Sequence, residues 1–161
     1  MLMLRSLFVM LVFLCSPACS ASNSSSGDPV NQFALADRFE QEPNDETPES
    51  LGIITPSLVV GGTMDECGSD GSFEGSDVDR FLFSVGEPVA IDLQLSVRGG
   101  DLDLLLYNPQ GELIADEHHA SDQGEALQLS IGPDAEYEVE LRCWMGDQPD
   151  WRLLFEQGAE R

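Results

Sequence analysis

Acidic side chains are the groups of this sequence most able to do chemistry. Thirty Asp and Glu residues stand against seven basic residues, all of them Arg, so the formal net charge is −23 at pH 7. This excess favours divalent cations and cationic partners. Binding to nucleic acid or to an anionic membrane surface needs a basic patch, so we expect neither as a partner.

The familiar catalytic constellations are missing from the sequence. Its two histidines, His118 and His119, are adjacent, and neighbouring residues of a strand point to opposite faces. We therefore expect a solvated strand end or loop there, not a shared metal site or a catalytic pair. No Gly-x-Ser-x-Gly elbow occurs, and paired carboxylates alone do not identify a glycosidase, which needs a cleft. The sequence predicts a protein that is not an enzyme.

The first two cysteines belong to an export signal. Arg5 precedes an apolar run over residues 7–14, and small residues follow up to Cys19, which is typical of a secretory signal. Ala18 before Cys19 resembles a bacterial lipobox, in which the cysteine becomes the lipidated first residue. We expect a lipoprotein-type signal peptide over residues 1–18; ordinary cleavage near Ala18 or Ala21 is the alternative. No run of about 20 apolar residues occurs, so a lipid would be the only membrane anchor.

The other two cysteines, Cys67 and Cys143, are the thiols that remain once the signal is removed and Cys19 is modified. In an oxidising compartment we expect them to form a disulfide. The alternative is two unpaired cysteines that act as small core hydrophobes.

The segments that carry these acidic and cysteine side chains are predicted to be mostly strands. Residues 19–39 form a Ser-rich tether and an N-terminal arm. From residue 51 onward apolar and polar residues alternate with period two, the pattern of half-buried strands. Turn signals, among them residues 99–100 and 146–150, separate the runs. The predicted strands are residues 57–61, 81–85, 91–98, 102–107, 112–116, 127–131, 137–143 and 151–155. About eight short strands indicate an all-β fold, an antiparallel sandwich or barrel.

Three motifs lie in the order found in the bacterial pre-peptidase C-terminal domain, which this sequence resembles over residues 40–156. They are Glu-Pro-Asn-Asp at 42–45, an acidic turn leading into an apolar strand at 76–83, and Gly-Asp-Leu-Asp-Leu at 100–104. The resemblance implies a jelly-roll-like antiparallel β-sandwich over residues 40–157. It also implies an accessory or binding module of the kind appended to secreted peptidases, here standing alone on its tether.

The resemblance further implies a calcium site, because collagen-binding members of this superfamily hold calcium at the N-terminal arm and the following acidic turn. Calcium takes six to eight oxygen ligands, which carboxylates and amides supply. Alternatively, residues 42–45 are only a turn that opens the domain. The matching positions are Glu40, Glu42, Asn44, Asp45 and Asp79, with Asp77 and Ser76 nearby.

The sequence as a whole predicts a non-enzymatic, exported binding or adhesion module. We expect an outer-membrane or cell-surface lipoprotein of a Gram-negative bacterium; a secreted or periplasmic protein is the alternative. Its partner would be an extracellular or envelope protein or polysaccharide. An accessory subunit of an envelope complex or secreted enzyme is the second reading. Trp144 lies on the face of its predicted strand opposite Cys143. It is a candidate binding aromatic unless loops and the second sheet cover it.

Overall fold

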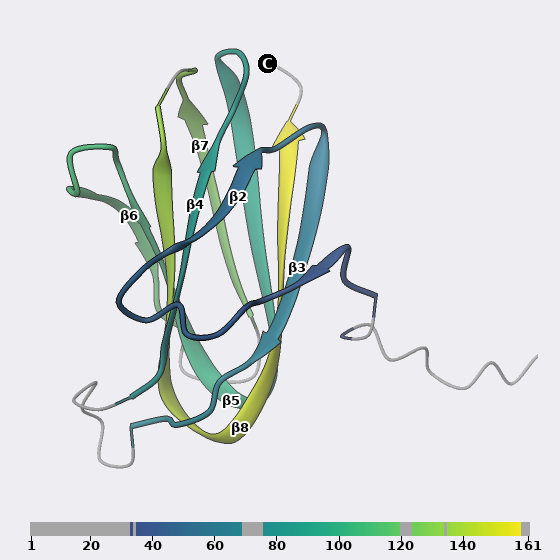
Figure 1. The fold of residues 1–161 in the computed structure, drawn as a ribbon, viewed down its shortest axis with the longest axis vertical. Helices are drawn as coiled ribbons and strands as arrows, with labels where there is room; N and C mark the ends of the chain where they lie inside the picture. The colour runs from purple at the N-terminus through teal and green to yellow at the C-terminus, as the bar shows by residue number, and fades with distance from the viewer. Residues whose placement is uncertain (1–32, 34, 69–75, 120–123, 134, 159–161) are drawn as a thin grey trace, which may run out of the picture. The chain divides into compact units, whose positions relative to one another are not determined.

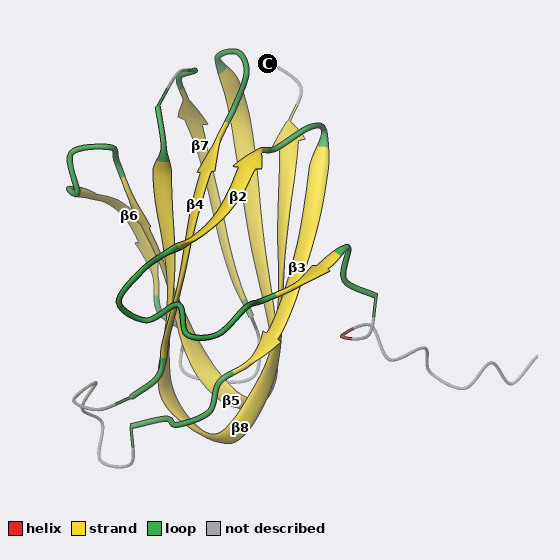
Figure 2. Ribbon diagram, viewed as in Figure 1, coloured by secondary structure: helices red, strands yellow, loops and turns green. Residues whose placement is uncertain are grey.

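Strands make up most of the described chain, and loops connect them (Figure 2). The computed structural model describes residues 33, 35–68, 76–119, 124–133 and 135–158. The predicted signal peptide, Cys19 and most of the tether lie outside these ranges. The part that is described holds no helix with the length and apolar character that a membrane crossing requires. Its strands are β1 (Arg38–Phe39), β2 (Glu49–Ile53), β3 (Ser57–Thr63), β4 (Val78–Ser84), β5 (Val89–Tyr107), β6 (Leu113–Glu117), β7 (Glu125–Ile131) and β8 (Tyr137–Gly158).

Two long strands organise the architecture. β5 has 19 residues and β8 has 22, and they pair antiparallel along nearly their whole length. The first half of β5 and the second half of β8 form a layer in the order β7-β5-β8-β3-β1. The other halves form a second layer, β6-β5-β8-β4-β2. Both strands bend from one layer into the other at the base of the view in Figure 1.

Aromatic contacts between the layers show that they pack face to face. Phe81 of β4 meets Trp151 of β8 with ring centroids 5.6 Å apart, and Phe83 meets Phe155 at 5.1 Å. All four side chains are at most 1% exposed and belong to one hydrophobic core. Burial of each such ring contributes about 1.5–3 kcal/mol. The prediction of an all-β sandwich with about eight strands is confirmed.

The strand lengths differ from the prediction. Residues 99–100 and 146–150, expected to be turns, are bends inside β5 and β8. The two strands bend together, so the ladder continues from Arg98–Asp150 to Gly100–Gly146 across a register shift. Four expected short strands therefore merge into two long ones. The turn residues mark where the sheet folds over, not where pairing ends.

The segment over residues 38–53, which is called the arm from here on, closes one side of the sandwich. β1 pairs parallel with β3, and β2 pairs parallel with β4, so these two pairs depart from the expected antiparallel arrangement. Because β3 and β4 belong to different layers, residues 40–48 pass from the edge of one layer to the edge of the other (Figure 1). The arm is thus anchored at both of its ends.

Candidate metal centre

Glu40 enters the site from the end of β1. Its backbone N–H donates to the carbonyl of Gly61 at 3.0 Å, which continues the pairing with β3. Its side-chain Oε1 accepts the backbone N–H of Thr63 at 2.6 Å. These two contacts hold the Glu40 carboxylate against β3, and its second oxygen, Oε2, is buried.

Gly62 of β3 makes room for that carboxylate. A Cβ atom at this position would overlap the carboxyl group of Glu40 and the indole ring of Trp151. Any larger residue would have to displace one of the two. The glycine therefore positions Glu40 against the core.

Asp79 comes from the other layer. In β4 it lies on the same inward face as Phe81 and Phe83, at every second position, and its exposed fraction is 0%. One oxygen each from Glu40, Glu42 and Asp79 lie within 4.8 Å of one another. Oxygens bound to one calcium ion at about 2.3–2.6 Å are at most about 5.2 Å apart, so this spacing fits a calcium shell.

Several buried polar atoms of this cluster have no hydrogen-bond partner among the described residues while the carboxylates are ionised; a proton on Asp79 would let it share one hydrogen bond with Glu40. The atoms without a partner are both carboxylate oxygens of Asp79, Oε2 of Glu40, and both side-chain amide atoms of Asn44, a residue that is 1% exposed. Leaving a buried polar atom unsatisfied costs about 1–3 kcal/mol. A cation bound among them would satisfy the oxygen atoms, though not Nδ2 of Asn44, which is a hydrogen-bond donor.

The electrostatics of the cluster point the same way. Burial, followed by the neighbouring Glu40 carboxylate, raises the pKa of Asp79 to about 10. Burial likewise raises the pKa of Glu40 to about 7, although the hydrogen bond from Thr63 opposes this shift. Without a cation the cluster holds protons that ordinary carboxylates would release at neutral pH. A divalent cation would favour the ionised forms.

Asp77 and Asp45 lie at the rim of the same cluster. Burial raises the pKa of Asp77 to about 6, the hydrogen bond from the backbone of Asp65 lowers it, and the charge of Asp45 raises it further. A groove next to these residues is lined by Glu42, Pro43, Asp45, Asp65, Glu66, Ser76 and Asp77. The structure thus gathers all the acidic residues that were candidates from the sequence at one junction of arm and sheet.

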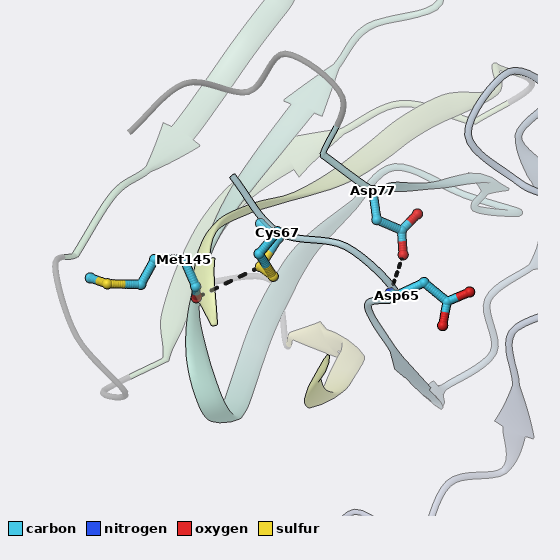
Figure 3. The surroundings of a disulfide bond; sticks show 5 residues. Asp65, Cys67, Asp77 and Met145 are labelled. Carbon is cyan, nitrogen blue, oxygen red and sulfur yellow. Dashed lines mark hydrogen bonds between the residues drawn. A yellow bond between two sulfur atoms is a disulfide. The ribbon is translucent and has the colours of Figure 1, made fainter. Parts of the chain in front are cut away.

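Asp65 and Glu66 were missed by the sequence analysis. Figure 3 shows Asp65 beside Asp77, whose Oδ2 accepts the Asp65 N–H at 2.6 Å. The N–H of Asp77 in turn donates to the carbonyl of Glu66 at 2.7 Å. Next in the chain is Cys67, which forms the expected disulfide with Cys143, with Cα atoms 4.9 Å apart. Proximity to Cys67 was the one sequence signal that could have placed this pair near β4.

The remaining candidates lie elsewhere. Cys19 falls outside the described residues. Trp144 is half-buried in β8, next to the register shift that faces Asp101 and Leu102 of β5, while Cys143 before it is fully buried.

No protein-family model and no curated protein matches the chain. Solved structures of similar fold include the pre-peptidase C-terminal domain of a collagenase from Bacillus anthracis. Its TM-score is 0.49 at 14% identity, over 66% of this chain and 93% of that one. A periplasmic inhibitor of g-type lysozyme from Aeromonas hydrophila has a TM-score of 0.42 at 12% identity, over 69% of this chain and 99% of the inhibitor. A GH26-CBM35 β-(1,4)-mannanase from Podospora anserina has a TM-score of 0.41 at 15% identity, over 66% of this chain and 28% of the mannanase.

Proposed function

We propose that this chain is an exported, non-enzymatic binding module in which calcium fastens the N-terminal arm to the β-sandwich. The observation that carries the proposal is the convergence of Glu40, Glu42 and Asp79, whose oxygens lie within 4.8 Å of one another. The buried, unpartnered oxygens of Glu40 and Asp79 support it. The motif resemblance to calcium-holding members of the pre-peptidase C-terminal superfamily supports it as well.

Calcium would act here as a structural link between layers. Glu40 and Glu42 belong to the arm, and Asp79 belongs to β4, so one ion bound by all three joins the arm to the second layer. The side-chain oxygen of Asn44 is a further ligand in this proposal, and Asp77 and Asp45 supply charge at the rim. The ion would supply the positive charge that offsets repulsion among these carboxylates.

Export and tethering complete the proposal. The Cys67–Cys143 disulfide supports an oxidising compartment, because such bonds are rare in the cytosol. Cys19 would carry the lipid, and the Ser-rich segment after it would hold the sandwich away from the outer membrane. The partner would be an extracellular or envelope protein or polysaccharide.

Binding to immobilised polymers tests this function. The purified chain is passed over collagen, chitin and peptidoglycan, in about 5 mM calcium or in chelator. The wild type and the distant exposed variant Glu87→Gln should be retained by at least one polymer in calcium only, and Asp79→Asn should not be retained. Retention by none of the polymers, with stoichiometric co-purification of a secreted enzyme, would favour the accessory role. Cleavage of a polymer would contradict the non-enzymatic assignment.

A further inference from the structure

A second group of metal-type ligands lies at the connection between β6 and β7, away from the acidic cluster of the arm. Glu117 is the last residue of β6, Glu125 is the first of β7, and His119 lies between them in the chain. His119 Nδ1 is 2.8 Å from Oε2 of Glu125 and 3.7 Å from Oε2 of Glu117. All three ligand atoms lie within 4.8 Å of one another.

Glu125 is the fixed member of this group. Its side chain is only 1% exposed, whereas that of His119 is 59% exposed. Its Oε1 accepts the backbone N–H of His119 at 2.7 Å, which leaves Oε2 directed at the imidazole. Gly124 before it has φ +71°, and a Cβ there would overlap the carbonyl oxygen of Leu95 in β5. The start of β7 is therefore held tightly against β5, and the buried carboxylate is aimed outward at His119.

We propose that Glu117, His119 and Glu125 form a binding site for a divalent transition-metal ion of the zinc type. Zinc binds imidazole nitrogen and carboxylate oxygen at about 2.0–2.2 Å, which places neighbouring ligand atoms of a tetrahedral site roughly 3.3 Å apart. The distances of 2.8 Å and 3.7 Å from His119 Nδ1 to the two carboxylate oxygens lie on either side of that value. The metal ion would replace the proton on Nδ1, and water would fill the exposed fourth position.

The ligand chemistry separates this site from the arm cluster. The arm cluster offers oxygen atoms only, which suit hard cations such as calcium. An imidazole ligand instead favours zinc, copper, nickel or iron. The two sites should therefore differ in the ions they take.

His118 provides the matched control. Its Nδ1 lies 3.1 Å from Asp103 and its Nε2 lies 2.6 Å from Asp116, so its two nitrogens contact two different carboxylates. The ring bridges these carboxylates and does not join them in a chelate around one nitrogen. Its exposure, 53%, is close to that of His119, so replacing either histidine should be equally tolerated by the fold.

Zinc titration of the metal-stripped full chain tests the proposal, in about 5 mM calcium to occupy the arm cluster. Wild type, His118→Ala and Asp79→Asn should bind one zinc ion with similar affinity. His119→Ala and Glu125→Gln should each lower the zinc affinity at least about tenfold, because even replacing a residue that only hydrogen-bonds to a metal ligand costs that much. Cobalt(II) should give visible absorption bands in wild type that His119→Ala lacks.

Two outcomes would overturn the site. One is unchanged zinc affinity in His119→Ala, which would leave only adventitious binding. The other is loss of zinc binding in Asp79→Asn, which would assign the zinc to the arm cluster instead. Because His119 is exposed, its variant is expected to fold, so the test does not depend on the buried Glu125.

Discussion

Asp79 is the side chain on which the calcium proposal depends most directly. It is fully buried, both of its carboxylate oxygens lack a hydrogen-bond partner among the described residues, and burial raises its pKa to about 10. A carboxylate in that environment is costly unless a proton or a cation neutralises it. An asparagine has nearly the same shape and no charge, so it separates the role of charge from that of packing.

The Asp79→Asn variant should fold and lose its response to calcium. At ten times Kd, calcium should stabilise the wild type by about 1.4 kcal/mol, or raise Tm by roughly 3–8 °C for a domain of this size. Asp79→Asn should show no shift, whereas Glu87→Gln should respond like the wild type. Thermal melts with calcium and with chelator measure both. A variant that keeps the full shift would remove Asp79 from the site.

The raised pKa values predict an unusual pH dependence in the absence of calcium. Glu40 and Asp77 titrate at about 7 and about 6 in the folded protein, above the ordinary values of 4.5 and 3.8. At pH values between the ordinary and the raised pKa of each group, the folded state therefore binds more protons than the unfolded state. The free energy of unfolding should fall as pH rises through that range. In chelator, Tm should decrease from about pH 5 to pH 8.

Calcium should change that dependence, because the ion competes with protons for the same oxygens. The calcium-induced rise in Tm should be small near about pH 5 and grow toward about pH 8. A double variant, Glu40→Gln with Asp77→Asn, should reduce the slope in chelator without removing it, because Asp79, with a pKa of about 10, still binds a proton in the folded state across this range. A Tm that rises with pH in chelator would show that these carboxylates are not held in the buried environment described.

The sequence could predict these ligands only in part. The chain itself brings Glu42, Asn44 and Asp45 close together. Glu40 and Asp79 are far apart in the sequence and were predicted only from the motif resemblance. Asp65 and Glu66 were not predicted: their approach to Asp77 depends on backbone hydrogen bonds, and proximity to Cys67 was the one signal for it. Contacts of this kind leave no periodic signal in the residues themselves.

At the scale of elements, the same distinction applies to the strands. Alternation identified the faces of β5 and β8 correctly, because period two follows from side-chain geometry alone. It could not show that each strand runs on through its glycines, since that depends on the partner bending with it. β1 and β2 were not predicted, because they are short edge strands of 2 and 5 residues and are mostly exposed.

The disulfide links two of these elements and should matter to both stability and metal binding. Cys67 and Cys143 are 76 residues apart, so the bond restricts the unfolded chain by roughly 4 kcal/mol in the loop-entropy estimate. Replacing both by Ala should lower the free energy of unfolding by up to that amount. It should also weaken calcium binding, because the backbone of Asp65 and Glu66, next to Cys67, hydrogen-bonds to the rim residue Asp77. Urea unfolding and calcium titration measure the two effects; unchanged stability would contradict the first.

At the scale of the whole molecule, composition and export fit together. A net charge of −23 with no Lys suits a compartment where millimolar divalent cations can offset the repulsion. Under the proposed function, a sandwich on a polar tether would need only a lipid anchor to stay at the envelope. In that proposal, the location of the protein would depend on one residue, Cys19.

Metabolic labelling tests that residue in cells. A fatty-acid analogue should label the wild type and should not label Cys19→Ser, which should instead appear in soluble fractions. Cys15→Ser serves as the control for a nearby cysteine and should be labelled like the wild type. Equal labelling of wild type and Cys19→Ser, or none in either, would contradict the lipid anchor.

The most direct test of the central claim is a crystal structure of the chain grown in about 5 mM calcium, a concentration at or above the Kd typical of extracellular modules. The calcium proposal predicts one ion between the arm and β4, with oxygens of Glu40, Glu42 and Asp79 at about 2.3–2.6 Å from it. Carboxylates of these three residues that point apart, with no ion between them, would contradict it.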